Sequence, residues 1–499
     1  MSQLASDPVL DCAAAGAFEK TKFEGDESRE WAAMKQAGAA LTQALWQDMA
    51  VAGVFPNAPG RVLVLVGKGH NGGDAMQAAA GLLQAAPDWQ IEVGFVSGQS
   101  TLRPLALAAW QWLQGVAGME RAQPVTLDQI ADSYTLVIDG VFGFQFRAPL
   151  REPAVGWLTR VNAIAAGLRA AVDLPSGCDD AAAFVADVTY ATGIVKSPLL
   201  SLPNAGRLRY LDLKFFAGDE SGDDRVVTHR VLDPLRELRP AHCDKRSFGH
   251  LLIVGGSRLY PGAVAMSAAA ALQSGVGLVT ALVPESLAAA YAARWPEVMW
   301  CGCPETPDGN IAMESGMLLA SRMERATALL IGPGLGREAE TMTFVADTIE
   351  RARVPLVLDA DALQHDLVAR GRAPRVLTPH QGEFDRILRG REQSVHDFDL
   401  GPPTVLVLKG PITRIVHERV VYHSLHGGPV LARGGSGDLL AGLIGGRLAA
   451  NPSTPLVAAA QGVVWHGLAA ERLAMRTGET ATRVTALIEE LAPVLRGAA

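Results

Sequence analysis

The chain has 499 residues, of which 49% are hydrophobic and 19% are charged, so we expect a folded protein with two or more domains rather than a disordered one. Its 44 Lys and Arg residues against 52 Asp and Glu residues give a net charge of −8, which argues against nucleic acid or an anionic membrane as the main partner. Aromatic residues make up only 6% while glycine numbers 52, a composition that favours an α/β protein over a β-sandwich.

The cysteine content and the amino terminus predict a cytoplasmic protein. Five scattered cysteines do not form a disulfide framework, which favours a reducing compartment. The first residues lack the basic and apolar segments of a secretory signal. The uncharged stretch 259–284 is rich in alanine, so we interpret it as a buried helix and strand rather than a membrane span, and we expect no membrane partner.

The first half of the chain has the pattern of a parallel α/β sheet. Short apolar runs at 61–67, 91–96, 136–143 and 170–177 end in Asp, Ser or Gly, and the first is followed by a glycine-rich turn and an alanine-rich helix. Buried parallel strands have this appearance. Because ligands of open α/β sheets bind at the carboxyl ends of the strands, we expect a binding site there.

A break in the pattern marks the boundary between two domains. Between residues 216 and 248 charge density rises, the apolar periodicity disappears, and Pro234 and Pro240 interrupt the segment. Such a segment is typical of a linker. We therefore predict domains at 1–230 and 231–499, and we expect residues 240–499 to fold alone.

The second half begins a new α/β pattern. Apolar runs that read as strands, followed by a hairpin, occupy residues 250–257, 328–336, 355–363, 375–384 and 404–423. Two helices that open near Gly435 and Pro455 then close the chain. The motifs of the two halves do not repeat each other, so the sequence predicts two different modules in tandem.

The segment Arg-Gly-Gly-Ser-Gly-Asp at 433–438 is the strongest single candidate for chemistry. It runs directly into a helix, whose free N–H groups bind anions, and its glycines let a phosphate approach the backbone. Asp438 can then act as a base toward a hydroxyl held beside that phosphate. The alternative is that Asp438 only provides a favourable charge at the start of the helix.

Other strand ends support a nucleotide site. Lys409 and Gly410 end one strand, and Thr413 begins the hairpin that follows. His380 and Glu383 follow a second strand. A third strand ends in three closely spaced glycines: Gly332, Gly334 and Gly336. If the sheet is parallel, these groups and Asp438 converge on one edge.

Ordered motifs in both halves resemble one known family. Over residues 240–495 the chain resembles the carboxy-terminal domain of the bifunctional NAD(P)H-hydrate repair enzymes, a ribokinase-like ADP-dependent dehydratase with an α/β/α fold. Over residues 25–215 it resembles their Rossmann-like, three-layer epimerase domain. The motifs that carry these likenesses are MKQAG, GKGHNGGDA, VIDGVFG, VDLPSG and ADVTYATGIVKSPLL in the first half, and IGPGLG, VLDADAL, LTPHQGEF, VLKGPITRIV and ARGGSGDLLAGLIGG in the second.

The dehydratase resemblance implies a set of contacts and a reaction. ADP phosphorylates the ring hydroxyl of the (S)-hydrate, and elimination of phosphate then yields NAD(P)H and leaves AMP, with Mg²⁺ screening the nucleotide and Asp438 as the base. The implied contacts to the hydrate are Ala263, Gly334, His380 and Asp438. The implied contacts to the adenine nucleotide are Lys409, Gly410, Pro411, Ile412, Thr413 and Gly437.

The epimerase resemblance implies a catalytic Asp173 and a potassium site. The implied K⁺ ligands are Asn71, Asp139 and Ser176. The implied substrate contacts are His70, Asn71, Gly72, Gly73, Asp74, Gly143, Phe144, Gln145, Phe146, Arg147, Ala148, Pro149 and Asp173. The family also has a lysine at the position of Lys196, which could equally be a surface lysine that closes a turn.

The epimerase loops depart from the family pattern at several positions. His70 and Ala75 replace an asparagine and a glycine, and Phe144 to Phe146 crowd a turn that usually contains glycine. We therefore expect a working but weakened epimerase that is stimulated by potassium.

The expected function is the repair of NADHX and NADPHX, with ADP as co-substrate and no nucleic acid partner. One alternative is a ribokinase-like small-molecule kinase. Others are a nucleotide-binding regulatory protein and a dehydratase whose epimerase-like domain is inactive. The oligomeric state, a homo-oligomer included, is left open by the sequence.

Overall fold

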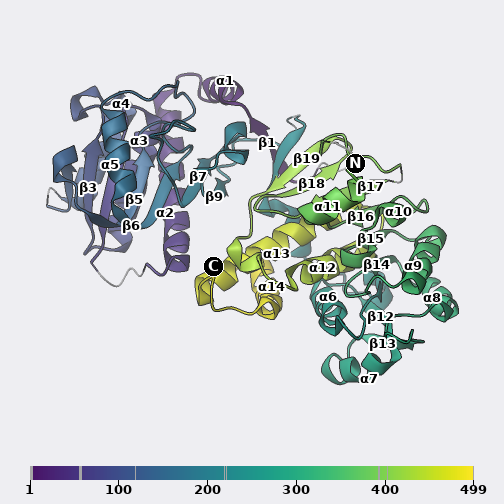
Figure 1. The fold of residues 1–499 in the computed structure, drawn as a ribbon. Coiled ribbons are helices and arrows are strands. Elements are labelled where there is room, and N and C mark those ends of the chain that lie inside the picture. The colour runs from purple at the N-terminus through teal and green to yellow at the C-terminus, as the bar shows by residue number, and fades with distance from the viewer. Residues whose placement is uncertain are drawn as a thin grey trace. The chain divides into compact units, whose positions relative to one another are not determined.

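A computed structural model describes residues 4–54, 59–118, 120–218, 220, 222–390, 394–401 and 403–497. The chain divides into two compact units (Figure 1). The amino-terminal unit comprises Asp7–Glu220 and Met475–Gly478, and the carboxy-terminal unit comprises Met1–Ser6, Ser221–Ala474 and Glu479–Ala499. Within the described part of the chain, no helix is both long and apolar enough to cross a membrane.

The amino-terminal unit is built on a parallel sheet. Its strands, in spatial order, are β4 (Ala122–Val125), β3 (Gln90–Phe95), β2 (Arg61–Val66), β5 (Ser133–Gly140), β6 (Ala165–Val172), β7 (Val188–Thr192) and β9 (Arg207–Leu211). All of these neighbours pair in parallel. Among the described residues, the helices that accompany the sheet are α1 (Cys12–Phe23), α2 (Glu27–Val51), α3 (His70–Ala85), α4 (Pro104–Ala117) and α5 (Ala154–Ala163). Two short strands, β1 (Ser6–Leu10) and β8 (Val195–Lys196), pair with each other.

Alternation along β2 explains why helices cover both faces of this sheet. Val62 and Val64 pack with buried residues of α2, α3 and α4, whereas Leu63 and Leu65 pack with buried residues of α5. Successive strand residues point to opposite faces, so a strand that is apolar throughout needs cover on both sides. The predicted three-layer α/β arrangement is confirmed.

The carboxy-terminal unit contains a larger sheet that is mostly parallel. Its strands, in spatial order, are β13 (Met299–Cys303), β12 (Leu278–Pro284), β11 (His250–Val254), β14 (Ala328–Ile331), β15 (Leu356–Leu358), β16 (Arg375–Leu377), β17 (Thr404–Leu408), β18 (Thr413–His417), β19 (Val420–Ser424) and β10 (Asp224–Val227). The pairs β17–β18 and β18–β19 are antiparallel, which confirms the predicted hairpin. The remaining pairs are parallel.

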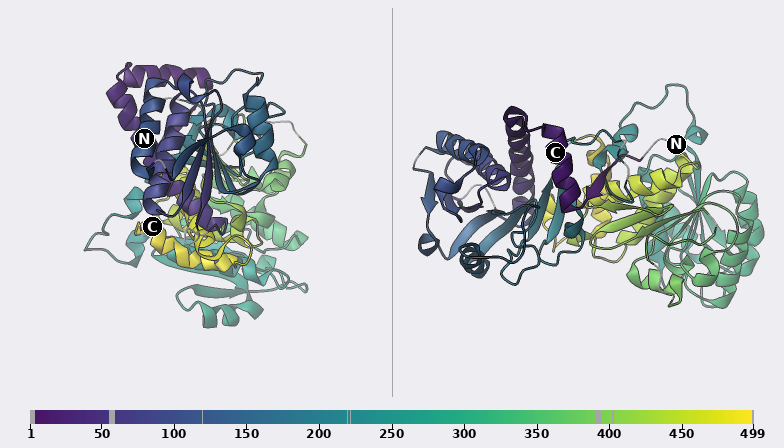
Figure 2. Two further views of the ribbon diagram at one scale, coloured as in Figure 1. Left: turned by 90° about the vertical axis from the view of Figure 1, so that its left-hand side faces the viewer. Right: turned by 90° about the horizontal axis from the view of Figure 1, so that it is seen from above.

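Helices again cover both faces of this sheet (Figure 2). One face packs against α6 (Pro261–Gln273), α7 (Glu285–Arg294), α12 (Ser436–Ala450), α13 (Pro455–Thr477) and α14 (Leu487–Leu495). The other packs against α8 (Gly316–Met323), α9 (Ala339–Arg351), α10 (His365–Val368) and α11 (Gln381–Leu388). The predicted helix and strand at 259–284 are α6 and β12, whereas α14 is a closing helix that the sequence did not predict.

The predicted linker contains structured elements of the carboxy-terminal unit. β10 pairs with β19, and the 3₁₀ segment η4 (His229–Leu235) buries Val231 and Leu232 in the core. The sequence showed no apolar period here because β10 is only four residues long and begins with the charged residues Asp224 and Arg225. The division of the chain at residues 220 and 221 thus precedes the predicted boundary at 230.

This placement changes which fragment should fold alone. A fragment of residues 240–499 lacks β10 and the buried Val231 and Leu232, and the loss of the two side chains alone costs about 3–6 kcal/mol. We expect residues 221–499 to unfold cooperatively on heating and residues 240–499 to have a much lower Tm or to be insoluble. Thermal unfolding followed by circular dichroism compares the two fragments with the full chain. Equal Tm values for both fragments would show that β10 and η4 are dispensable.

Candidate functional sites

The carboxyl ends of parallel strands form a polar cluster in the carboxy-terminal unit. β14, β15, β16 and β17 lie side by side, so the segments that follow them meet at one edge, as predicted. The main chain joins two of these segments, because Lys409 N–H donates to the Pro379 carbonyl at 2.8 Å and His380 forms a β-bridge with Lys409. The Lys409 Nζ lies 3.3 Å from Asp359 Oδ1 and 4.0 Å from Glu383 Oε2.

The start of α12 lies beside this lysine. A Cβ atom added to Gly437 would be 3.0 Å from Lys409 Nζ, so the glycine leaves room for the amino group next to the helix start. Gly435 precedes the helix with a φ of 91°, in the left-handed region that glycine tolerates. The predicted nucleotide contacts Lys409 and Gly437 are therefore neighbours, and both adjoin the free N–H groups of a helix start.

Asp438 lies in the first turn of α12, and its raised pKa suits a general base. Burial raises the pKa of Asp438 to about 6, and the nearby Asp359 carboxylate adds to this effect while Lys409 opposes it. Its backbone carbonyl accepts a hydrogen bond of 2.9 Å from Ser267 Oγ on α6, which fixes the helix start against its neighbour. A carboxylate with a pKa near 6 is ionised at neutral pH and accepts a proton more readily than an ordinary aspartate.

The other predicted contacts of this unit lie on the same segments. A Cβ atom on Gly334 would lie 3.1 Å from the Ala263 Cβ, so these two predicted hydrate contacts are neighbours. His380 caps α11, where its ring Nδ1 accepts from Glu383 N–H and Glu383 accepts from His380 N–H. The remaining predicted nucleotide contacts form the turn between β17 and β18 and the first residue of β18: Gly410, Pro411, Ile412 and Thr413.

Asp359 is a site residue that the sequence analysis did not assign. It is buried, and its Oδ1 accepts hydrogen bonds from Thr378 Oγ1 at 2.7 Å and from Lys409 Nζ. The aspartate directly follows β15, within a motif used for the family resemblance, so its position at a strand end was an available signal. Glu383 was noticed but given no role, and it is also buried next to Lys409.

In the amino-terminal unit, the glycine-rich loop is held tightly against the sheet. A Cβ atom on Gly67 would lie 1.8 Å from the Val141 carbonyl oxygen, and one on Gly72 would lie 2.7 Å from the Gly67 carbonyl oxygen. His70, which begins α3, points toward Glu30, with 3.5 Å between its Nε2 and a carboxylate oxygen. The backbone therefore requires these glycines, whereas the unusual His70 lies at the partly exposed rim.

A buried carboxylate with oxygen-rich surroundings lies under this loop. Asp139 accepts hydrogen bonds of 2.7 Å from both the N–H and the Oγ of Ser176. The Asn71 amide donates to the Phe142 carbonyl at 3.0 Å, and Ser176 Oγ lies 3.4 Å from the same oxygen. Burial raises the pKa of Asp139 to about 6. The structure therefore brings the three predicted K⁺ ligands together around a buried carboxylate.

Asp173 and Lys196 form a buried ion pair beside this cluster. Their exposed side-chain fractions are 7% and 1%, so the alternative of a surface lysine at position 196 is wrong. Asp173 has a left-handed φ of 68°, and its Oδ2 accepts from Phe144 N–H at 3.3 Å. The Lys196 Nζ lies 5.2 Å from the centre of the Phe144 ring. Gly143 is also near, because a Cβ there would lie 3.2 Å from Asp173 Oδ2.

The turn at 143–149 accommodates its large residues by placing Phe144 against the buried ion pair. Phe144 lies against Lys196, and the Phe146 ring lies 5.2 Å from that of Phe142. The other predicted substrate contacts of this turn are exposed: Gln145, Arg147, Ala148 and Pro149. The phenylalanines therefore form walls of the site.

Two acidic groups next to the ion pair were only partly foreseen. The predicted contact Asp74 has a pKa well above its usual range because of burial and the proximity of Asp173 and Glu19. Glu19, on α1, was not predicted at all. Burial raises the pKa of Glu19 to about 7, with Lys196 opposing and Asp173 adding to the shift. Helix α1 lies against Phe144, because a Cβ atom placed on Gly16 of this helix would be 3.3 Å from the Phe144 ring. Nothing in the sequence of α1 indicates that it lies here.

Comparison with known proteins decides the family. Residues 251–493 match the family described as NAD(P)H-hydrate dehydratase, and residues 31–197 match the family described as YjeF-related protein N-terminus. The bifunctional NAD(P)H-hydrate repair enzyme Nnr of Gloeobacter violaceus is 34% identical, over 95% of this chain and 95% of that protein. The chain belongs to the bifunctional NAD(P)H-hydrate repair enzyme family.

Other known proteins are also similar to this chain. The Nnr enzyme of Escherichia coli K12 is 32% identical over 86% of this chain and 84% of its own length. The ADP/ATP-dependent NAD(P)H-hydrate dehydratase of Bacillus subtilis, solved with ATP and Mg²⁺, is 27% identical and covers 52% of this chain and 93% of its own, with a TM-score of 0.45. The predicted family is confirmed for both halves. Helix α1, with Glu19, precedes the matched range of the first half.

Proposed function

We propose that this chain repairs hydrated NADH and NADPH in two steps. The amino-terminal unit interconverts the R and S forms of NADHX and NADPHX, and the carboxy-terminal unit dehydrates the S form with ADP. The observation that carries the proposal is the cluster of Lys409, Gly437 and Asp438 at a helix start. It occurs in a chain that belongs to this enzyme family along almost its entire length.

In the proposed dehydration, hydroxide is replaced by a better leaving group. Asp438 accepts the proton of the ring hydroxyl while the hydroxyl oxygen attacks the terminal phosphorus of ADP. The bond from that phosphorus to the bridging oxygen breaks, which releases AMP. The phosphorylated hydrate then loses phosphate from one ring carbon and a proton from the adjacent ring carbon to water, and the double bond that forms between the two carbons gives NAD(P)H. Lys409 and the N–H groups at the start of α12 stabilise the negative charge of the transferring group.

Asp359 acts in this scheme through its neighbours. Its carboxylate holds Lys409 by an ion pair of 3.3 Å, and its charge contributes to the raised pKa of Asp438. It therefore orients the cation that faces the phosphates and makes Asp438 a stronger base. Mg²⁺ would screen the phosphates as part of the nucleotide complex.

In the proposed epimerisation, the buried pair Asp173 and Lys196 transfers protons while a substituent leaves and returns at one ring carbon. Asp173 is the proton-accepting group, and its contacts with Lys196 Nζ and Phe144 N–H hold the carboxylate in place. Phe144 provides an apolar wall beside the lysine. Glu19 and Asp74, whose pKa values are raised, are nearby groups that can hold a proton near neutral pH.

Potassium fits the residues around Asp139. The carboxylate is fully buried and has no cationic side chain as a hydrogen-bond or ion-pair partner within the described ranges, and a buried charge without a counter-ion is costly. Hard oxygen atoms of Asn71, Asp139 and Ser176, together with the Phe142 carbonyl, suit a weakly held monovalent cation. A bound K⁺ would supply the missing positive charge and fix the turn that precedes Phe144.

Replacement of Asp139 with asparagine tests this assignment. The change removes the charge that attracts the cation but keeps the size and a hydrogen-bonding oxygen, so we expect the K⁺ stimulation of epimerisation to disappear while the unit stays folded. The measurement is the rate of R-to-S conversion against K⁺ concentration at constant ionic strength, with Na⁺ as replacement. A K⁺ response identical to that of the native chain would contradict the assignment.

The overall proposal is tested with purified full-length protein. We expect (S)-NADHX with ADP and Mg²⁺ to give NADH, measured by its absorbance at 340 nm, together with AMP and phosphate, and we expect ADP to support a higher rate than ATP. With the R epimer the same mixture reports on epimerisation. A stable phosphorylated product without NADH would identify a small-molecule kinase instead. Conversion of the R epimer at only the spontaneous rate would mean that the epimerase-like unit is inactive.

The free state of all five cysteines accords with action in a reducing compartment such as the cytoplasm.

A further inference from the structure

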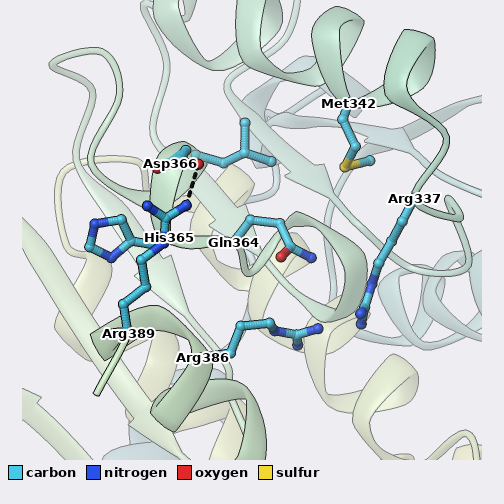
Figure 3. A pocket seen from close by; sticks show the side chains of 8 residues that line it. Arg337, Met342, Gln364, His365, Asp366, Arg386 and Arg389 are labelled. Carbon is cyan, nitrogen blue, oxygen red and sulfur yellow. Dashed lines mark hydrogen bonds and ion pairs between the residues drawn. The ribbon is translucent and has the colours of Figure 1, made fainter. Parts of the chain in front are cut away.

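A basic cavity of about 470 Å³ lies on the carboxy-terminal unit, between the loop that follows β14 and helices α9, α10 and α11 (Figure 3). Besides His365, the titratable residues that line it are Arg337, Arg386, Arg389 and Asp366. Three arginines and one aspartate give a formal charge of +2. Arginine guanidinium groups that converge from different elements suit an anion with several oxygen atoms, because they donate two parallel hydrogen bonds.

The three arginines are held in different ways. Arg337 Nε donates to Asp361 Oδ1 at 2.9 Å, and the other oxygen of Asp361 accepts from Gly336 N–H at 3.0 Å. Arg389 forms an ion pair with Asp366. Arg337 is thus tied to the glycine-rich loop, and Arg389 is largely neutralised by its partner.

One hydrogen-bond donor of Arg386 is unsatisfied among the described residues. Its Nε is buried and has no hydrogen-bond partner among the residues that the structure describes, and its nearest carboxylate, that of Glu383, lies 3.9 Å from Nη2. Figure 3 shows the guanidinium groups of Arg386 and Arg337 and the amide of Gln364 turned toward a common space. A buried donor without a partner is costly, and a small movement of this lining side chain toward an anion in the cavity would satisfy it.

Two elements connect this cavity with the proposed hydrate site. Arg337 follows Gly334, a proposed hydrate contact, by three residues. Helix α11 begins after His380, another proposed contact, and Arg386 lies six residues later, about 9 Å along the helix axis. In a nicotinamide dinucleotide, a ribose and two phosphates separate the ring from the adenosine half. A substrate whose ring lies near Gly334 and His380 can therefore place phosphate oxygens at the cavity.

We propose that this cavity binds phosphate groups of the dinucleotide substrate during dehydration. The inference rests on the proposed function and adds to it a second anchor, remote from the reacting hydroxyl. Met342 and Leu367 supply apolar surface beside the arginines, which suits the sugar that adjoins a phosphate. The phosphate is either part of the pyrophosphate, which both hydrates carry, or the 2′-phosphate, which only NADPHX carries.

Kinetics of Arg386→Gln and Arg337→Gln distinguish these cases. Arg351→Gln is the matched control, since Arg351 lies on α9 with its side chain 75% exposed and pairs with Asp347. A residue that binds the substrate equally strongly in the ground state and in the transition state affects KM but not kcat. We expect KM for the (S)-hydrate to rise about tenfold, the loss of roughly one charged hydrogen bond, with kcat and the KM for ADP within twofold of native values.

The outcomes show whether the cavity binds the pyrophosphate or the 2′-phosphate, and they can overturn the proposal. A rise in KM for both NADHX and NADPHX identifies the pyrophosphate, and a rise for NADPHX alone identifies the 2′-phosphate. Unchanged KM values for both hydrates overturn the proposal. So does an equal rise in the KM for ADP, which would assign the cavity to the co-substrate. Arg386→Lys keeps the charge and should recover part of the loss.

Equilibrium binding of the product NADPH, measured by calorimetry, does not depend on turnover. We expect Arg386→Gln to weaken this binding about tenfold and Arg351→Gln to leave it unchanged. If the native protein binds NADPH through Arg386 but does not dehydrate NADHX, the proposed function fails and the phosphate site stands. If Arg386→Gln binds NADPH as tightly as the native protein, the phosphate site is wrong whatever the activity. Arg337, whose side chain is 55% exposed, provides a second variant that should not disturb folding.

Discussion

Asp438→Asn is expected to lower the rate of dehydration of (S)-NADHX by about 10²- to 10⁴-fold. The asparagine keeps the shape of the aspartate at the start of α12 but cannot accept the proton of the hydroxyl. Binding of ADP should persist, because Lys409 and Gly437 remain in place. The measurement is single-turnover formation of NADH together with calorimetric binding of ADP. Asp347→Asn, at a partly exposed position of α9, is the control for the loss of one carboxylate.

The pH dependence of the native enzyme should report on the same group. Because the pKa of Asp438 is raised to about 6 by burial, the base is ionised above pH 6 and is lost as the pH falls through that value. We expect kcat/KM to decline below about pH 6. If the asparagine variant turns over at the native rate and its kcat/KM declines at the same acidic pH, Asp438 is not the base.

Stability provides an independent check on the integrity of this variant. A carboxyl whose pKa is higher in the folded than in the unfolded state destabilises the fold as the pH rises through the two values. At pH 8 the buried charge of Asp438 is therefore unfavourable, and Asp438→Asn should have a Tm equal to or above that of the native chain. A loss of activity with an unchanged or higher Tm is then a loss of chemistry rather than of structure.

Asp173→Ala is expected to abolish conversion of the R epimer to the S epimer above the spontaneous rate. The change removes the proposed proton acceptor and leaves the amino group of Lys196 buried without its counter-charge. The assay adds the variant to (R)-NADHX with ADP and Mg²⁺ and follows NADH. Dehydration of the S epimer by the same sample is an internal control, because the residues proposed for it belong to the other compact unit.

A second substitution separates the chemistry from strain at this position. Asp173 has a φ of 68°, where alanine is strained but asparagine is tolerated. Asp173→Asn should therefore avoid the backbone strain of Asp173→Ala and have a higher Tm than that variant, while remaining inactive toward the R epimer; both variants lack the counter-charge of Lys196. If Asp173→Asn converts the R epimer at the native rate, the carboxylate is not the proton acceptor.

Much of the architecture could be predicted from local sequence patterns. Short apolar runs that end in glycine or a polar residue predicted several strands of each sheet, among them β2, β5, β11 and β14, because a strand covered on both faces is apolar throughout. The turn before α12 predicted the helix start and Asp438, since glycine-rich segments at helix starts have few other uses. Strand ends also placed His380 and Lys409 at one edge, since parallel strands bring their carboxyl ends together.

The tertiary structure decided what depends on neighbours that are distant in the chain. Whether Lys196 was a surface lysine or the buried partner of Asp173 could not be decided from its local sequence, because burial is a property of the surrounding elements. The same holds for Glu19, which α1 brings to Asp173, and for β10, which takes its place by pairing with β19. The basic cavity of Arg337 and Arg386 likewise requires two separate segments to meet. The sequence by itself determined the elements and the reactive groups at their ends, whereas packing between elements determined which charges are buried and paired.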